Sequence, residues 1–281
     1  MISFPAIMAD ELGRHIASDF RRLFGSSHQD KAERLDGAIR MALECIGKSD
    51  ALYHNVEHTF LVTLVGRDIL HGRMLTERLE PDDYTHLIAA CLLHDIGYVR
   101  GILRGDCRDR FVIDASGTTV TLPRGASDAA LSPHHVDRSK LFIMERLADS
   151  PLLDAERVAR AVEFTRFPAP ESATNGQEDR EGHLVQAADL IGQLGDPLYL
   201  RKANALFHEF EEIGVNGRLG YNSPADMVER FPDFYWTSVS PHLGDAMTYL
   251  NVTASGRQWI ANLHNHVFCA QHDFALMGPQ R

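Results

Sequence analysis

Apolar residues recur at spacings of three and four along most of the chain, which is the repeat of amphipathic α-helices. The run from Leu87 to Leu93 is apolar on nearly every face, so the helix that contains it is expected to be buried. The pattern predicts an all-α fold, with helices over residues 9–24, 31–47, 55–71, 83–97, 135–149, 154–165, 181–194, 199–213 and 242–250.

Two segments break the helical pattern. Residues 111–122 alternate β-branched residues around Asp114-Ala115-Ser116-Gly117, which predicts a small β-hairpin inserted between helices. Residues 165–182 are polar and contain proline and glycine, which predicts a loop. Because no repeat or long linker divides the chain, we expect one domain over residues 1–281, made of N-terminal helices (1–50), a core (about 50–195) and a C-terminal helical extension (about 196–281).

Charge and composition exclude several classes of function. The chain has 28 basic and 39 acidic residues and a net charge of −11, so we expect no nucleic-acid polymer as a partner. The four cysteines form no Cys-X-X-Cys pair, which argues against a disulfide framework and fits a reducing cytoplasm. We find neither the pattern of a signal peptide nor an apolar stretch of about 18 residues, so secretion and membrane insertion are not expected.

Three stretches place histidine or aspartate where a helix should be apolar. His54 and His58 lie four residues apart, so they share one helical face. His94 and Asp95 end the apolar run, and Asp189 interrupts another one in the sequence AADLI. An unpaired buried carboxylate costs several kcal/mol, so it is usually ion-paired, hydrogen-bonded or bound to a metal. Each position alone could be a helix cap or a satisfied core residue, but three together favour a shared site.

A metal ion would explain these positions jointly. His58, His94, Asp95 and Asp189 offer two imidazoles and two carboxylates from three predicted helices, which a bundle can direct at one point. Such ligands suit Mn²⁺, Mg²⁺, Fe²⁺, Co²⁺ or Zn²⁺ without choosing among them. A divalent metal ion is therefore the expected cofactor.

The order of these motifs resembles the HD superfamily of metal-dependent phosphohydrolases. The segments YHNVEH and AACLLHDIG are similar to the YHNxxH and HD motifs of cyclic-nucleotide phosphodiesterases, over roughly residues 50–195. The resemblance implies an HD-domain helical bundle in which Asp95 can bridge to a second ion and His54 is the general acid. It also implies a set of metal ligands, namely His58, His94, Asp95 and Asp189.

The chain departs from these relatives at several positions. Tyr98 stands where the phosphodiesterase motif HDxxHxG has its last histidine, and no base-recognising glutamine can be placed. His135 resembles a histidine that binds a second metal in binuclear relatives, and His134 competes for that role. Glu163 falls near the usual next ligand. One ion is therefore expected, and a second ion remains open.

The resemblance implies hydrolysis of a small phosphoester, with a nucleotide or cyclic nucleotide favoured over a sugar phosphate. A metal-bound water would attack the phosphorus, and His54 would protonate the leaving oxygen. Positive side chains would stabilise the phosphoryl group, although a solvated surface cation is the simpler explanation for each candidate. The candidates are Arg138 and Arg166, followed by Arg100, Arg104 and Lys140.

Two other functions stay open. The protein could be a metal-binding HD sensor with little turnover, and a branch of the same superfamily uses these ligands in di-iron oxygenases. The aromatic segment FPDFYW at 231–236 is interpreted as packing, and the C-terminal region could bury itself against a second copy in a homo-oligomer.

Overall fold

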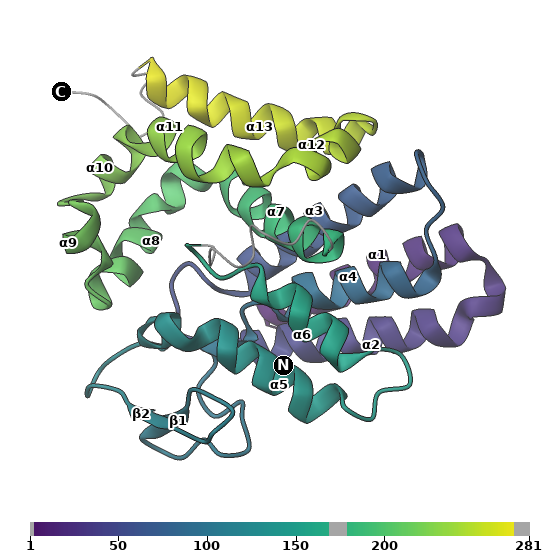
Figure 1. The fold of residues 1–281 in the computed structure, drawn as a ribbon, viewed down its shortest axis with the longest axis horizontal. Helices are drawn as coiled ribbons and strands as arrows, with labels where there is room; N and C mark the ends of the chain where they lie inside the picture. The colour runs from purple at the N-terminus through teal and green to yellow at the C-terminus, as the bar shows by residue number, and fades with distance from the viewer. Residues whose placement is uncertain (1–2, 169–178, 273–281) are drawn as a thin grey trace.

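The computed structural model describes residues 3–168 and 179–272, and within these ranges it contains thirteen α-helices and one two-stranded antiparallel hairpin (Figure 1). The prediction of an all-α fold with a small hairpin is confirmed, since β1 (Arg110–Val112) pairs with β2 (Thr119–Thr121). The helices are α1 (Phe4–Phe24), α2 (Gln29–Ile46), α3 (Val56–Met74), α4 (Pro81–Leu93), α5 (His135–Leu147), α6 (Ala155–Glu163), α7 (Arg180–Leu194), α8 (Tyr199–Glu212), α9 (Val215–Leu219), α10 (Pro224–Glu229), α11 (Phe231–Phe234), α12 (Gly244–Asn251) and α13 (Ala254–Gln271).

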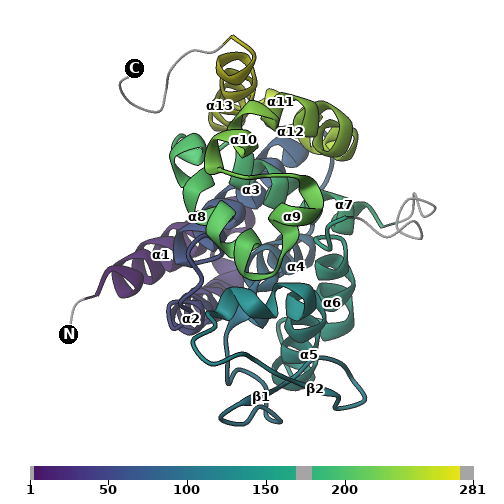
Figure 2. The same cartoon turned by 90° about the vertical axis from the view of Figure 1, so that its left-hand side faces the viewer.

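The first and last helices belong to one hydrophobic core. α1 and α2 pack against each other as an antiparallel pair, and both contact α4 (Figure 1). α12 and α13 pack on α3 at one end of the molecule, while the hairpin lies beyond α5 at the other end (Figure 2). Most buried apolar side chains form one cluster from Ala9 to Val267, and a small separate cluster joins Tyr53 to Leu206, Phe207 and Met227.

α3, α4 and α7 form the centre of this bundle. The backbones of α3 and α7 approach so closely that a methyl group at Gly192 would lie 2.8 Å from the Cα of Val62, which explains the glycine. All residues of α4 from Tyr84 to Leu93 are buried, as expected for the apolar run. Side chains from three neighbouring helices can therefore meet in the interior.

The predicted helix over 83–97 was too long at its C-terminus. α4 ends at Leu93, and a 3₁₀ turn follows. The hydroxyl of Ser139 in α5 donates to the His94 carbonyl (2.7 Å) and accepts the N–H of Gly97 (2.8 Å). Because the His94 carbonyl and the Gly97 N–H are hydrogen-bonded to α5, they do not extend α4.

Other corrections concern the ends of the chain. α1 begins at Phe4 instead of residue 9, because Ser3 caps it and Pro5 occupies the first turn. The C-terminal extension was predicted to be helical, but α9, α10, α11 and α13 were not predicted as individual helices. In α13 the apolar residues Trp259, Leu263 and Val267 lie at helical spacing, but glycine, asparagine and histidine are interspersed with them. Packing against α3 nevertheless stabilises it.

The predicted polar loop and the aromatic segment can also be located along the chain. Of the loop predicted over 165–182, residues 169–178 lie outside the described residues. Phe231 and Tyr235 of the aromatic segment are buried in the core, in agreement with a packing role. Within the two described ranges, the helices are too short or too polar to span a lipid bilayer.

Candidate metal centre

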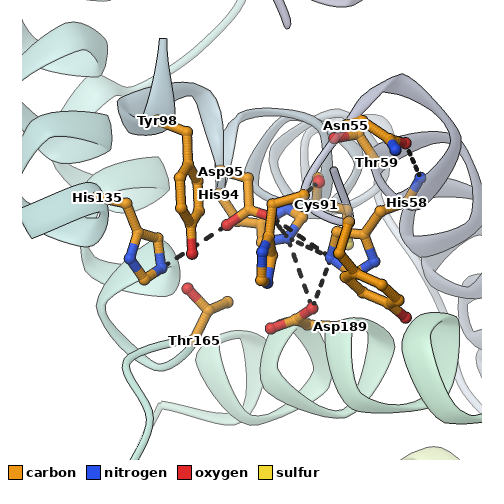
Figure 3. Close-up of polar contacts among 12 residues, drawn as sticks. Asn55, His58, Thr59, Cys91, His94, Asp95, Tyr98, His135, Thr165 and Asp189 are labelled. Atoms are coloured by element: carbon orange, nitrogen blue, oxygen red, sulfur yellow. Dashed lines mark hydrogen bonds and ion pairs between the residues drawn. The ribbon is translucent and has the colours of Figure 1, made fainter. Parts of the chain in front are cut away.

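The polar stretches singled out in the sequence meet at one point between α3, α4 and α7 (Figure 3). His58 lies in the first turn of α3, where the side chain of Asn55 caps the helix. His94 and Asp95 follow the last turn of α4, and Asp189 lies in the middle of α7. His58 and Asp189 are therefore held by helices, and His94 and Asp95 by the turn that directly follows α4.

Four side-chain atoms converge at this point. The Nε2 atoms of His58 and His94 lie 3.3 Å apart. Asp95 Oδ2 lies 3.4 Å from the first of these nitrogen atoms and 3.2 Å from the second, and Asp189 Oδ1 lies 3.2 and 3.5 Å from them. The side chain of Asp189 is 21% exposed while the other three are buried, so the centre is accessible from the α7 side.

The hydrogen bonding of these groups fits a bound cation. His94 Nδ1 lies 2.8 Å from the Cys91 carbonyl and donates its proton there, so Nε2 carries the lone pair when the ring is neutral, as it is when it binds a metal ion. Asp95 Oδ2 is buried and receives no hydrogen bond. Lone pairs that face one another in a buried site are unfavourable unless a cation lies between them. His58, His94 and Asp95 therefore form a buried group that could hold a metal ion.

Both carboxyl groups of the centre are ionised. Burial on its own would raise the pKa of Asp95, but in the metal-free centre the charge of the protonated His94 lowers it well below its usual range. Burial also opposes ionisation of Asp189, and contacts with His94 and His58 again lower the pKa of that carboxyl. The two aspartates are therefore present as the anions that a divalent ion requires.

His54 lies beside the centre, with its ring 5.5 Å from that of His58, and it is held by Glu209 of α8. His54 Nδ1 lies 2.5 Å from Glu209 Oε2, while Oε1 accepts the backbone N–H groups of Tyr53 (2.7 Å) and His54 (3.3 Å). Burial would lower the pKa of His54, but the charge of Glu209 raises it to about 9. Nδ1 is thus occupied, and Nε2 is left for another partner.

Glu209 was missed in the sequence. It is 3% exposed and lies three residues after Leu206, on the apolar side of α8. An acidic residue on the apolar face of an amphipathic helix could therefore have identified it. It lies outside residues 50–195, to which the motif resemblance extends. The C-terminal extension therefore contributes directly to this site.

His135, rather than His134, faces the centre. His135 Nε2 lies 3.7 Å from Asp95 Oδ1, and Nδ1 donates to the Ser132 carbonyl at 2.5 Å. The ring of Tyr98 stacks on His135, as Figure 3 shows. One oxygen of Asp95 thus faces two histidines and the other oxygen faces a third.

Arg138 is not available to a phosphate, and this prediction was wrong. The residue is fully buried, and each of the five N–H groups of its guanidinium has a partner in the protein. The partners are the Asp106 carboxylate (3.1 and 2.9 Å) and the carbonyls of Gly97 (2.7 Å), Val99 (3.0 Å) and Val112 (2.5 Å). Arg138 instead connects α5 to the turn after α4 and to the hairpin.

Other candidate cations are also engaged. Arg166 bonds Glu163 at 2.5 Å and Asp137 at 2.7 Å. Lys140 shares the same Glu163 at 2.6 Å, and Arg100 pairs with two aspartates. These three side chains are held by carboxylates in the described structure.

The chain matches the sequence model of one protein family over nearly its whole length. The sequence model of the Npun_R2479-like family matches residues 3–273. A search of curated proteins found no match. The matched range includes the four converging side chains and also α8, which carries Glu209.

Proposed function

The chain belongs to the Npun_R2479-like family, and we propose that it is a metal-dependent phosphohydrolase of the HD superfamily that cleaves a phosphodiester bond in a small nucleotide or cyclic nucleotide. The observation that supports this proposal is the convergence of two imidazoles and two carboxylates on one buried point beside His54. The order of the four residues along the chain agrees with the signature of that superfamily.

The proposal gives the four converging residues the task of holding and orienting one divalent ion. When bound, such an ion polarises a phosphate oxygen and lowers the pKa of a coordinated water toward neutrality. The Cys91 carbonyl fixes the tautomer of His94 for this purpose. The ligands would be His58, His94, Asp95 and Asp189.

His54 would donate a proton to the leaving oxygen of the substrate. Glu209 binds Nδ1 and so directs Nε2 toward the reacting group. The negative charge of Glu209 also stabilises the protonated imidazole, which is the form that a general acid needs. The two histidines of the YHNVEH segment would thus have different tasks, with His58 on the metal and His54 on the substrate.

The nearby arginine side chains are already bonded to groups of the protein, which favours a substrate with a single negative charge. Arg138 has no free donor, and Arg166 is bound to two carboxylates. Phosphomonoesters carry about −1.5 to −2 charges near pH 7 and need more positive charge than one divalent ion balances beside two aspartates. A phosphodiester, with one negative charge, fits this site better.

The proposal can be tested with protein loaded with Mn²⁺ and assayed on bis(p-nitrophenyl) phosphate, p-nitrophenyl phosphate and a panel of cyclic and linear nucleotides. We expect diesters to be cleaved faster than monoesters. His54→Gln should lower turnover about 10²–10⁴-fold with metal retained. Asp189→Asn should lose both metal and turnover, and Asp30→Asn, an exposed change on α2, serves as the control.

Two results would contradict the proposal. A loaded protein that binds a nucleotide but cleaves none of the panel would support the sensor alternative. An iron-loaded protein that consumes oxygen in the presence of a substrate, without phosphoester cleavage, would support the oxygenase alternative.

A further inference from the structure

The ring of Tyr98 stacks on two imidazoles beside the metal centre. It is nearly parallel to the ring of His54, with centroids 4.8 Å apart and an interplanar angle of 12°. It is also nearly parallel to the ring of His135, at 4.6 Å and 23° (Figure 3). Tyr98 is 2% exposed, so both stacking contacts are made inside the protein.

The imidazole of His54 is otherwise held at one nitrogen. Its Nδ1 lies 2.5 Å from Glu209 Oε2. A ring that is bonded through one atom can still tilt about that bond, and the tilt moves its other nitrogen. The rings of Tyr53 and His58 meet His54 at steep interplanar angles, 71° and 80°. Among the ring contacts of His54 within residues 3–168 and 179–272, the near-parallel one is with Tyr98, so Tyr98 sets the plane of this imidazole.

The backbone of Tyr98 is fixed by α5. Arg138 donates to the carbonyls of Gly97 and Val99, the residues that flank Tyr98, at 2.7 and 3.0 Å. A methyl group at Gly97 would collide with the carbonyl oxygen of His135, so the turn and α5 are in direct backbone contact. Tyr98 could therefore move only if the turn after α4 separated from α5.

The side chain of Tyr98 is anchored to the same residue as His135. The Tyr98 hydroxyl donates to Ser132 Oγ at 3.1 Å, and His135 Nδ1 donates to the Ser132 carbonyl at 2.5 Å. Tyr98 and His135 are thus joined by their stacking contact and by a common hydrogen-bond partner. Together they form a fixed support against which the His54 ring lies.

We propose that Tyr98 is a positioning residue whose ring sets the plane of the His54 imidazole and thereby directs Nε2 at the leaving oxygen of the substrate. This inference rests on the proposed function, in which a proton moves from Nε2 to the leaving oxygen while the bond between phosphorus and that oxygen breaks. Glu209 determines which nitrogen faces the substrate, and Tyr98 determines the plane in which that nitrogen lies. The ring of Tyr98, and not its hydroxyl, carries out this task.

A misplaced general acid should slow the cleavage of poor leaving groups most. Diphenyl phosphate and bis(p-nitrophenyl) phosphate are both diesters with one negative charge. Phenolate is a stronger base than p-nitrophenolate, so its departure depends more on the proton from His54. A loss of folded protein or of bound metal would slow both reactions alike, whereas a tilted His54 ring would slow the cleavage of diphenyl phosphate more.

The test measures both esters with full-length, Mn²⁺-loaded wild type, Tyr98→Leu and Tyr98→Phe. We expect Tyr98→Leu to lower kcat about 100-fold for diphenyl phosphate and about 10-fold for bis(p-nitrophenyl) phosphate. The KM values and the affinity for Mn²⁺ should stay within about threefold of wild type. Tyr98→Phe, the conservative variant that keeps the ring, should restore the ratio of the two kcat values.

Tyr235→Leu is the matched control. Tyr235 is also 2% exposed, and its ring contacts Phe231 and His264 in the C-terminal helices. The substitution removes an equally buried tyrosine ring away from His54. The ratio of the two kcat values should therefore stay within about twofold of wild type.

Nuclear magnetic resonance tests the stacking without any turnover. Ring protons of an imidazole that stacks on an aromatic ring shift upfield. In full-length protein with Mg²⁺, a diamagnetic ion, the imidazole C–H signals of His54 and His135 should be shifted upfield in the wild type and in Tyr98→Phe. Tyr98→Leu should lose this shift. Spectra of His54→Gln and His135→Gln assign the signals.

Thermal unfolding monitored by circular dichroism shows whether each variant is folded, and Tyr98→Met replaces Tyr98→Leu if the latter is not. Unshifted imidazole signals in the wild type would overturn the positioning role and leave the proposed function standing. An equal loss of both activities in folded Tyr98→Leu or Tyr98→Met, or a changed ratio in Tyr235→Leu, would do the same. A wild-type protein that cleaves neither ester would overturn the proposed function together with the role of Tyr98 in it.

Discussion

Asp19 in α1 and Asp95 after α4 are both buried and both contact histidines, yet their hydrogen bonding is opposite. Asp95 Oδ2 receives no hydrogen bond and faces two imidazole nitrogens. The carboxylate of Asp19 is surrounded by donors on three helices. These donors are Arg22 (2.6 Å), Arg67 (3.3 Å), Tyr84 (3.1 Å) and His71.

This difference separates a structural acid from a ligand. The protons around Asp19 complete its hydrogen bonding within the protein, so it joins α1 to α3 and α4 without any other group. Asp95 faces atoms that offer lone pairs, so a cation from outside the chain completes its surroundings. The neighbours of a buried carboxylate, more than its burial, therefore indicate its role.

The largest expected effect is the loss of metal binding in Asp95→Asn. An amide removes the negative charge that faces His58 and His94, so the affinity for Mn²⁺ should fall by at least about 100-fold. Isothermal titration calorimetry on metal-free protein measures this change. An affinity within threefold of wild type would show that Asp95 is not a ligand and that the two aspartates do not differ as argued.

The reciprocal variant, Asp19→Asn, should affect stability and not metal binding. It leaves Arg67 and His71 partly buried without their anion, which is expected to lower the free energy of unfolding by about 3–5 kcal/mol. Urea denaturation of the metal-free proteins measures this change, and Asp30→Asn on the exposed face of α2 is the matched control. A loss below 1 kcal/mol, or a lower affinity for Mn²⁺, would contradict the structural role.

The sequence distinguished these two aspartates only in part. The spacing of apolar residues predicted most of the helices. A polar residue within an apolar run can be recognised without the tertiary structure, so the interrupted runs identified the four residues of the centre. These are His58, His94, Asp95 and Asp189. Asp19 also lies on the buried face of its helix, but its partners come from distant parts of the chain. The pattern alone could not show whether its charge was compensated.

The same limit explains the errors around the site. Arg138 looked like a surface cation because charged residues are rarely fully buried, and its five partners come from the turn after α4, the hairpin and Asp106. Glu209 acquires its role only through the packing of α8 against the loop that carries His54. Both roles depend on contacts between residues that are far apart in the sequence.

The pH dependence of stability provides a second test of the contacts around Asp19. Burial alone would raise the pKa of Asp19, but hydrogen bonds from His71 and Arg22 and the charges of His71 and Arg67 lower it below its usual range. The native state then binds fewer protons than the unfolded state near the ordinary aspartate pKa of about 3.9. The stability from Asp19 is present above that pH and is lost as the pH falls toward the native pKa.

The free-energy difference between wild type and Asp19→Asn should thus shrink below about pH 4. Urea denaturation at fixed ionic strength over a series of pH values measures it. A difference that grows as the solution becomes more acidic would mean that the sign of the pKa shift is wrong.

The smallest expected effect concerns Glu209, a third buried acid. It binds His54 and does not face the imidazole nitrogens of the metal centre. In Glu209→Gln the side chain can still accept the backbone N–H groups of Tyr53 and His54, but the charge that stabilises the His54 imidazolium is lost. We expect turnover of bis(p-nitrophenyl) phosphate to fall about 10-fold with unchanged affinity for Mn²⁺. Glu212→Gln, one turn away on α8 and bonded to Ser127, is the matched control and should keep turnover within about twofold. If Glu209→Gln weakened metal binding as strongly as turnover, Glu209 would belong with Asp95 as a residue that supports the ion, and its separate role through His54 would be excluded.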